Sequence, residues 1–323
     1  MDPRPAVVVT GAAGYVGRLC VAALAKRRNE LSALIALDWT EVDSADRLDG
    51  VVYERDDICD PALKELFRTY SIDTVIHLAS IVRTPAGAPK DLAYRVDVLG
   101  TQNVLEACEA VGAKKLIVTS SGAAYGYHPD NPKWLDEEDP LRGNDEFEYS
   151  KNKRLIEEML ARWREERPEL KQVVFRPGTI VGPDVHSPVT DLFEKRVILG
   201  IAGSDSPFVF IWDEDLVECL VEAVFSDKVG IYNQAGDGAL TPREIAKLLG
   251  KPYVPMPAQV VKGALWMLKR LGLTENGPER VAFLQYRPVL SNRRLKEEFG
   301  YTPRLSSREA FELYARSRGL LAP

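Results

Sequence analysis

Two hydrophobic patterns alternate along the first half of the chain. Short runs of Val, Ile, Leu and Ala contain almost no polar residue, and longer stretches between them are apolar only at every third or fourth position. Continuous apolar runs are typical of strands buried on both faces of a parallel sheet, and the longer period is typical of amphipathic helices. The runs predict strands at residues 6–10, 33–38, 51–55, 73–79, 115–120 and 172–177.

The amphipathic stretches predict helices between these strands, at residues 15–28, 61–70, 99–112 and 149–168. A strand that alternates with a helix in this way folds into a doubly wound parallel sheet with right-handed crossovers. The pattern therefore predicts an α/β fold.

The pattern changes after about residue 178, where "RPGTIVGPDVHSP" is rich in Gly and Pro and is typical of a loop. We expect residues 1–177 to form a nucleotide-binding domain, to which 207–233 return with one more strand, a helix and a final strand. Residues 178–206 and 234–323 are then a smaller, mostly helical substrate lobe. In open α/β sheets, ligands bind at the carboxyl ends of the strands, where we expect this lobe to lie.

A glycine-rich stretch, "TGAAGYVG" at residues 10–17, connects the first strand to the first helix. Gly11 permits a tight turn, Gly14 lets the backbone approach a pyrophosphate at the helix N-terminus, and Gly17 lets the helix pack closely on the strand. The motif alone does not exclude a purely structural turn.

Asp38 ends the second predicted strand, 21 residues after Gly17. A carboxylate there can accept hydrogen bonds from the adenosine ribose hydroxyls and would repel a 2′-phosphate. The next residues, Trp39 and Thr40, bring no Arg for that phosphate, so NAD is favoured over NADP. The alternative is that Asp38 only caps a loop.

Tyr149 and Lys153 are four residues apart in "YSKNK", which places them on one face of a predicted helix. A phenol becomes a base at neutral pH only when a neighbouring cation favours its phenolate. A pair of this kind alone is common on surface helices. Here it follows "VTSSGAAYG", a strand end with Ser120 and Ser121, where a serine hydroxyl can orient a substrate oxygen toward Tyr149.

Together these residues resemble the extended short-chain dehydrogenase/reductase family, which includes nucleotide-sugar epimerases, sugar dehydratases, 3β-hydroxysteroid dehydrogenases and dihydroflavonol reductases. The resemblance tapers after about residue 250. It is carried, in order, by "TGAAGYVG", Asp38, "DDICD", "HLAS", "GTQNVLEAC", "TSSGAAYG", "YSKNK", "RPGTIVGP" and "FIWDEDLVECLV".

The resemblance implies a Rossmann-type fold and a catalytic triad of Ser121, Tyr149 and Lys153. Tyr149 as phenolate would take the proton of a substrate hydroxyl while a hydride passes to NAD, or give a proton to a ketone in the reverse direction. Lys153 would also hold the nicotinamide ribose. The implied cofactor-binding residues are Gly11, Gly14, Tyr15, Val16, Gly17, Asp38, Asp57, Ile58, Leu78, Ala79, Ser80, Thr119, Tyr149, Lys153 and Pro177.

Departures from the family pattern narrow the chemistry. The sugar 4,6-dehydratases carry Thr-Asp-Glu where this chain has Ser121, Gly122 and Ala123, so the acid and base for water elimination are missing. Many nucleotide-sugar enzymes have Asn in place of Thr179 and Asp97. These changes argue against a nucleotide-sugar substrate. "HLASIV" and "YRVDVLGTQNVLEAC" resemble the hydroxysteroid dehydrogenase-like branch of the family more closely, which favours a simple NAD-dependent oxidation or reduction at a secondary alcohol or ketone.

Two alternatives stay open beside that interpretation. The first is a nucleotide-sugar 4-epimerase that uses the same triad twice. Arg287, Arg293 and Arg294 could then contact a diphosphate, although a solvated helix start is an equally good interpretation of them. The second is a non-catalytic NAD-sensing protein, against which the intact triad argues.

Composition excludes several other classes. A net charge of −6 gives no support to a nucleic-acid partner, because phosphate binding on that scale needs a basic face. Free thiols are favoured over disulfides or a zinc site, since the four cysteines form no CxxC pair, and the three histidines have no ligand spacing. We expect no metal, and we expect a cytoplasmic protein without an export signal or membrane span.

Three further features leave roles open. The segment 260–273 is apolar on one face with basic residues interspersed. A membrane-surface helix is possible there, but packing on neighbouring helices is favoured, so we expect no membrane partner. His128 could contact substrate, and a turn histidine is the default. The helices at about 92–112 and 147–166 are the ones this family pairs into a homodimer.

Overall fold

The computed structural model describes residues 4–85, 87–274 and 277–321, and the chain divides into two compact units. The first comprises Met1–Ser120, Leu155–Arg176 and Asp213–Tyr232, and the second comprises Ser121–Arg154, Pro177–Trp212 and Asn233–Pro323. Two of the breaks fall beside the predicted boundaries at 177 and 233. Residues 121–154, which we assigned to the nucleotide-binding domain, make their contacts within the second unit instead.

A seven-stranded sheet runs in the order β10-β6-β5-β4-β1-β2-β3, and the pairs from β6 to β3 are parallel. The order reverses between β1 and β4, which confirms the predicted doubly wound fold. The strands are β1 (Ala6–Thr10), β2 (Ala33–Asp38), β3 (Val52–Arg55), β4 (Thr74–His77), β5 (Lys115–Thr119), β6 (Lys171–Pro177) and β10 (Gly230–Gln234).

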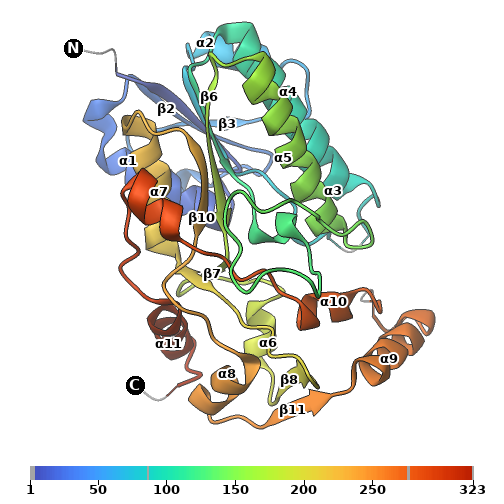
Figure 1. The fold of residues 1–323 in the computed structure, drawn as a ribbon. Coiled ribbons are helices and arrows are strands. Elements are labelled where there is room, and N and C mark those ends of the chain that lie inside the picture. Colours follow the sequence, from blue (N-terminus) through green and yellow to red (C-terminus); the bar gives the residue numbers. More distant parts are fainter. Residues whose placement is uncertain (1–3, 86, 275–276, 322–323) are drawn as a thin grey trace. The chain divides into compact units, whose positions relative to one another are not determined.

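Helices cover both faces of the sheet (Figure 1). On one face α1 (Tyr15–Lys26) packs against α7 (Asp213–Phe225). On the other face lie α2 (Leu63–Thr69), α3 (Leu92–Tyr94), a π-helical turn (Arg95–Leu99), α4 (Gly100–Val111) and α5 (Glu148–Glu166). The burial of β1, β4 and β5 on both faces explains why their sequences are continuous apolar runs.

The second unit is built from short strand pairs and an aromatic core. Strand β7 (Thr179–Val181) pairs with β9 (Phe210–Trp212), and β8 (Ile198–Ile201) pairs with β11 (Tyr253–Met256). The rings of Phe193, Phe208, Phe210 and Phe311 contact one another in its core. Its helices are α6 (Thr190–Glu194), α8 (Pro242–Leu248), α9 (Ala258–Arg270), α10 (Arg280–Gln285) and α11 (Ser307–Ser317), with a π-helical turn at Leu295–Phe299.

Helix α11 has no counterpart among the predicted elements, although the sequence contains its start signal. Ser306 accepts a hydrogen bond from the backbone N–H of Glu309, and the Glu309 carboxylate accepts one from the backbone N–H of Ser306. This Ser-x-x-Glu capping box satisfies two N–H groups at the helix start. The apolar residues that follow, among them Phe311 and Tyr314, are fully buried.

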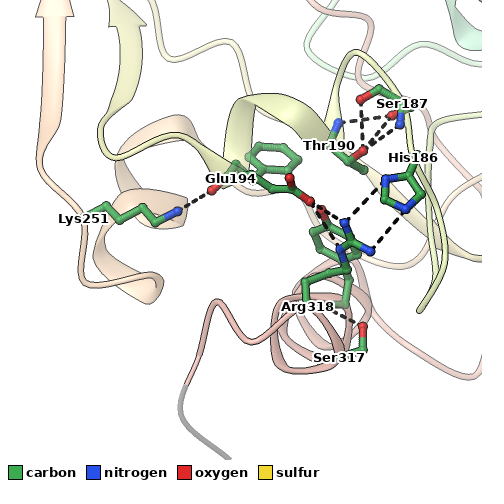
Figure 2. Close-up of polar contacts among 9 residues, drawn as sticks. His186, Ser187, Thr190, Glu194, Lys251, Ser317 and Arg318 are labelled. Atoms are coloured by element: carbon green, nitrogen blue, oxygen red, sulfur yellow. Dashed lines mark hydrogen bonds and ion pairs between the residues drawn. The ribbon is translucent and has the colours of Figure 1, made fainter.

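The C-terminal end of α11 is held by polar contacts to the segment around α6 (Figure 2). Arg318 donates to Glu194 at 2.8 Å and lies 3.4 Å from the His186 ring. Lys251, which follows α8, donates to the backbone carbonyl of Phe193 in α6. The Arg318 and Glu194 side chains are partly exposed, so their ion pair orients α11 more than it stabilises the fold.

Helix α9 differs from the expected packing. Across Ala258–Arg270, all within the described residues, no side chain is buried. Only Ala258, Val261 and Leu265 are half-buried, and the rest of the helix is exposed. None of the helices in the described ranges is long and apolar enough to cross a membrane.

The four cysteines are free thiols, and Cys20, Cys108 and Cys219 are buried. Burial raises the pKa of Cys20 and of Cys108 to about 12, so both remain protonated. Within the described ranges, no group of three or more His, Cys, Asp or Glu side chains could hold a metal ion.

Candidate functional site

The first unit contains a glycine cradle between β1 and α1. Gly11 has φ +71°, and a Cβ there would lie 2.6 Å from the backbone N of Ala79. A Cβ on Gly17 would lie 2.0 Å from the carbonyl oxygen of Gly11. Neither position can accept a side chain, since no Cβ approaches backbone atoms so closely. The two glycines let the chain turn tightly and bring α1 against the strand end.

The N-terminus of α1 presents backbone hydrogen-bond donors. Gly14 is the N-cap, no side chain caps the helix, and its first turn contains no acidic residue. The backbone N–H groups of Tyr15, Val16 and Gly17 therefore lie at the positive end of the helix. The Tyr15 hydroxyl donates to Asp213 at the start of α7, which ties the two helices together. Such an N-terminus is suited to an anion.

Asp38 lies at the end of β2 beside this cradle. Its Oδ2 accepts from the backbone N–H of Ala13 at 2.9 Å, and its Oδ1 accepts from that of Thr40 at 2.8 Å. Asp38 and Ala12 line a hollow of about 120 Å³. Each carboxylate oxygen can accept more than one hydrogen bond, so the cap on the glycine loop leaves capacity for ribose hydroxyls.

The loop after β4 contains Leu78, Ala79 and Ser80 and adjoins the cradle through Gly11. Asp97, fully buried in the π-helical turn, accepts from the backbone N–H of Ile81 at 2.8 Å. Its other oxygen and the Ser80 hydroxyl are buried without a partner. Two unsatisfied polar atoms beside the cradle are costly, and a polar ligand could satisfy them.

The segment after β3 holds Asp57 and Ile58. The Asn103 side chain, from α4, donates to the carbonyls of Ile58 and Asp60 at 2.7 Å. Asp57 caps its own turn through the backbone N–H of Cys59. Sequence reasoning missed Asn103, because one polar residue on a helix does not show which loop it faces.

In the second unit, Ser121 follows β5 and caps a 3-10 turn (Gly122–Tyr125), accepting from the backbone N–H of Ala123 at 3.1 Å. Tyr149 is half-buried and Lys153 is buried in the first turns of α5. The Lys153 ammonium lies 5.6 Å from the centre of the Tyr149 ring. The predicted pair thus shares one helix face, as its spacing required.

Ser150 fixes this end of α5. It is fully buried, donates to the carbonyl of Ala123 at 2.6 Å, and accepts from the backbone N–H of Asn144 at 3.1 Å. The hydroxyl therefore connects the turn that follows Ser121 to the residue next to Tyr149. Sequence reasoning missed it, since the pattern of "YSKNK" gives no reason to single out its serine.

Arg287 is a buried cation without a carboxylate partner in the described chain. Its guanidinium lies 3.6 Å from the ring centre of Phe208 and 5.0 Å from that of Phe283. Nη1 donates to the carbonyl and hydroxyl of Ser206, while Nε is buried without a partner. Burial lowers the pKa of Arg287, since no negative charge compensates it.

The buried Tyr127 side chain is influenced electrostatically by both Arg287 and Tyr149. Its ring meets Phe147 and Phe283 edge-on, each 5.4 Å away between ring centres. Burial raises the pKa of Tyr127, Tyr149 adds to this rise, and Arg287 opposes it. Tyr149 and Arg287 therefore both lie within electrostatic reach of one phenol, inside a single unit.

The other singled-out residues of the second unit have local partners. Arg293 and Arg294 form exposed ion pairs with Glu297 and Glu298, one helical turn away. His128 donates through Nε2 to the carbonyl of Arg142. For the two arginines, the solvated helix start is the better interpretation.

Two predicted cofactor residues end strands of the sheet. Thr119 is the last residue of β5, and Pro177 is the buried last residue of β6. Their strands are neighbours in the sheet, so both residues lie at its carboxyl edge.

The geometry of the first unit is compatible with bound NAD. The cradle has no room for a side chain at Gly11 or Gly17, the α1 N-terminus presents its backbone N–H groups, and Asp38 ends β2. These are the elements that a dinucleotide requires.

Comparisons with known proteins agree with this geometry. Residues 7–209 match the NAD dependent epimerase/dehydratase family. The chain is 27% identical to an uncharacterised protein of Mycobacterium tuberculosis over 97% of its length and 84% of that protein. It is 32% identical to a UDP-glucose 4-epimerase of Halalkalibacterium halodurans over 65% of its length and 63% of that enzyme.

Among solved structures, UDP-glucose 4-epimerase of Thermus thermophilus in complex with NAD is similar, with a TM-score of 0.72 and 26% identity. The alignment covers 97% of this chain and 99% of that one. The chain is an NAD-dependent enzyme that acts at a secondary alcohol or ketone. It belongs to the NAD-dependent epimerase/dehydratase family.

Proposed function

We propose that the substrate is a sugar joined to a diphosphate and that Ser121, Tyr149 and Lys153 carry out the acid–base steps of its oxidation. Arg287 is the observation that carries the substrate class. A buried guanidinium with no carboxylate is costly in the free protein and becomes favourable when an anion pairs with it. UDP-sugar epimerases among the similar proteins support the same class.

The proton steps follow from the side chains of the second unit. The Lys153 ammonium stabilises the phenolate form of Tyr149, and this phenolate takes the proton of the substrate hydroxyl and becomes a neutral phenol. The Ser121 hydroxyl orients the substrate oxygen. NAD, when bound, supplies the hydride chemistry. Gly11, Gly14 and Gly17 with the α1 N-terminus hold its pyrophosphate, and Asp38 holds its adenosine ribose.

The other cofactor residues act through position. Asp57 and Ile58 would contact the adenine of a bound NAD, the loop of Leu78, Ala79 and Ser80 would lie along its pyrophosphate and ribose, and Thr119 and Pro177 would line its nicotinamide. The orphaned oxygen of Asp97 and the Ser80 hydroxyl support the loop assignment, because both have hydrogen-bond capacity left over.

We propose that this oxidation is followed by its reversal on the other face of the sugar, so that the net reaction is epimerisation. Tyr149 then removes a proton and later returns it to the same oxygen, so the sugar is inverted at one carbon and no reduced cofactor accumulates. A net oxidation, which the sequence pattern favours, uses the same residues and differs in that the keto product leaves.

The test combines product analysis with one substitution. The purified protein is incubated with UDP-glucose, UDP-galactose and their N-acetylated forms, while NADH absorbance and sugar products are followed. We expect epimers without net NADH. Tyr149→Phe should lower turnover by about 10²- to 10⁴-fold with NAD binding retained. Tyr70→Phe is the matched control. Net NADH with a keto product would replace epimerisation by oxidation, and equal activity of Tyr149→Phe would remove the triad assignment.

We further propose a cytoplasmic homodimer. Leu99, in the turn before α4, is exposed, and a surface hollow of about 250 Å³ is lined by Gln102 of α4 and by Met159, Arg162, Trp163 and Glu166 of α5. Such a face suits a second copy of the chain. Sedimentation of the wild type and of Leu99→Glu tests this: a dimer that the substitution does not weaken would contradict the α4–α5 interface.

A further inference from the structure

Helix α9 and the turn that follows it at residues 271–273 expose large apolar side chains that no other part of the described chain covers. The exposed fractions are 54% for Trp266, 58% for Met267, 64% for Leu271 and 70% for Leu273. In Figure 1, α9 lies at the margin of the second unit, following β11 and next to α10. A patch of this kind on a soluble surface marks an interaction site.

The helix is divided into an apolar and a basic side. At 100° per residue, Val260, Met267 and Leu271 lie on one outward face. Lys262 and Lys269 lie together on the side of the helix opposite this face, and Arg270 lies toward one border of the face. The basic side chains therefore extend from the opposite side of the helix to one border of the apolar face.

Trp266 lies between the basic side chains, with the Arg270 guanidinium 5.4 Å from its ring centre. An indole ring next to cationic side chains is typical of the headgroup level of a bilayer, where its apolar body and its polar N–H are both satisfied. Trp266 thus adds an interfacial side chain to the face.

The charge of the segment is opposite to that of the chain. Residues 258–273 contain Lys262, Lys269 and Arg270 and no Asp or Glu, whereas the whole protein has a net charge of −6. Lys269 forms an ion pair at 3.2 Å with Glu279, which lies beyond the segment, and the segment itself is net positive. Anionic lipid attracts such a segment while its apolar face enters the boundary of the acyl chains.

We propose that α9 is a membrane-surface helix that docks the enzyme on anionic lipid bilayers. The helix lies in the plane of the interface, because 13 residues span only about 20 Å and cannot cross the hydrocarbon core. A second copy fits less well, because a symmetrical α9–α9 contact would bring two copies of Arg270 to one apolar interface, and α9 contains no Asp or Glu to pair with them. The inference is independent of which sugar the enzyme uses.

Co-sedimentation with vesicles tests the proposal on the full-length protein. One vesicle type is phosphatidylcholine alone, and the other contains equal parts of phosphatidylcholine and phosphatidylglycerol. We expect binding to the second type that weakens with salt. The triple variant Lys262→Gln/Lys269→Gln/Arg270→Gln should bind on the order of 100-fold more weakly, since each basic residue near an anionic surface contributes several-fold.

A second variant tests the apolar face. Met267→Glu/Leu271→Glu should abolish vesicle binding, while Leu313→Glu, at another exposed leucine on α11, should leave it unchanged. The emission of the wild type should shift to shorter wavelength on binding, and Trp266→Phe should lose that shift. Thermal unfolding and NAD binding confirm that each variant is folded.

Three results would overturn the proposal. The first is no binding of the wild type to anionic vesicles. The second is equal binding by Met267→Glu/Leu271→Glu. The third is self-association of the wild type, without vesicle binding, that this double variant abolishes, which would assign the face to a second copy of the chain.

Discussion

Arg176 and Arg287 are both buried, but their partners differ completely. Arg176, in the first unit, binds both carboxylate oxygens of Glu157, at 2.6 Å for the closest contact, and both side chains are 3% exposed. Arg287, in the second unit, lies against Phe208 and Phe283, and within the described ranges Ser206 is its one hydrogen-bond partner. A paired buried charge stabilises the folded chain, whereas an unpaired buried charge is suited to binding an ion or ligand of opposite charge.

The pair in the first unit connects three elements. Glu157 lies on α5, two turns after Tyr149, Arg176 lies on β6, and the Ser120 hydroxyl donates to Glu157 at 2.5 Å. The network thus ties the helix that carries Tyr149 and Lys153 to the strand ends of the sheet. It is a positioning network and needs no contact with substrate.

The largest effect should come from breaking this pair. Glu157→Gln leaves the Arg176 charge buried without its carboxylate, which should cost about 3–5 kcal/mol of unfolding free energy. Urea unfolding measures the loss. The double variant Glu157→Gln/Arg176→Met should recover much of it, because the orphaned charge is gone. A loss below about 1 kcal/mol, the range of exposed pairs, would show that the pair is not structural.

The opposite result is expected for the second arginine. Arg287→Met removes an uncompensated buried charge, so the unfolding free energy should be unchanged or higher. The affinity for UDP, measured by calorimetry, should fall by about 10- to 100-fold, since a charge-assisted hydrogen bond contributes about 1.5–3 kcal/mol. Arg294→Met, at a half-buried arginine paired with Glu298, is the control. Unchanged UDP affinity in Arg287→Met would contradict the diphosphate assignment.

The surroundings of Arg287 also show which features could not be predicted from the sequence. The strands, the glycine turn, Asp38 and the Tyr149–Lys153 face could be predicted, because each depends on a local period or on a motif of fixed spacing. The burial of Arg287 could not, since Phe208 and Phe283 are distant in the sequence and only packing brings them around it. Asn103 and Ser150 were missed for the same reason.

The second unit was predicted less well than the sheet. Its strand pairs β7–β9 and β8–β11 have only three or four residues each, too few for a recognisable pattern. Helix α11 is different, because its capping box was readable in the sequence. Helix α9 was read correctly as amphipathic, but periodicity cannot show whether an apolar face has a partner.

A third prediction distinguishes the NAD affinity, which we assign to residues of the first unit, from the UDP affinity, which we assign to Arg287. Asp38→Asn keeps an acceptor for one backbone N–H and loses charge at the ribose position. NAD affinity should fall by about 10-fold, the equivalent of one hydrogen bond. UDP affinity should not change. Calorimetry with each ligand checks both statements. A parallel loss of UDP affinity would mean that the substitution disturbs more than the cofactor cradle.

The smallest effect concerns a third buried cation. Lys115, at the start of β5, donates to the carbonyls of Ala223 and Ser226, and burial lowers its pKa. Carbonyl dipoles satisfy its hydrogen bonds without supplying the full charge that Glu157 gives Arg176. Lys115 is therefore intermediate between the two arginines.

The pH dependence of stability should show this intermediate character. Because the pKa of Lys115 is lower in the folded chain than in the unfolded one, unfolding takes up a proton at pH values between the two. Stability therefore rises with pH in that window. As the pH rises toward the ordinary lysine pKa of about 10.4, wild type should gain stability relative to Lys115→Met, measured by urea unfolding. A difference that falls with rising pH would mean that the folded chain binds this proton more tightly, as a carboxylate partner would require.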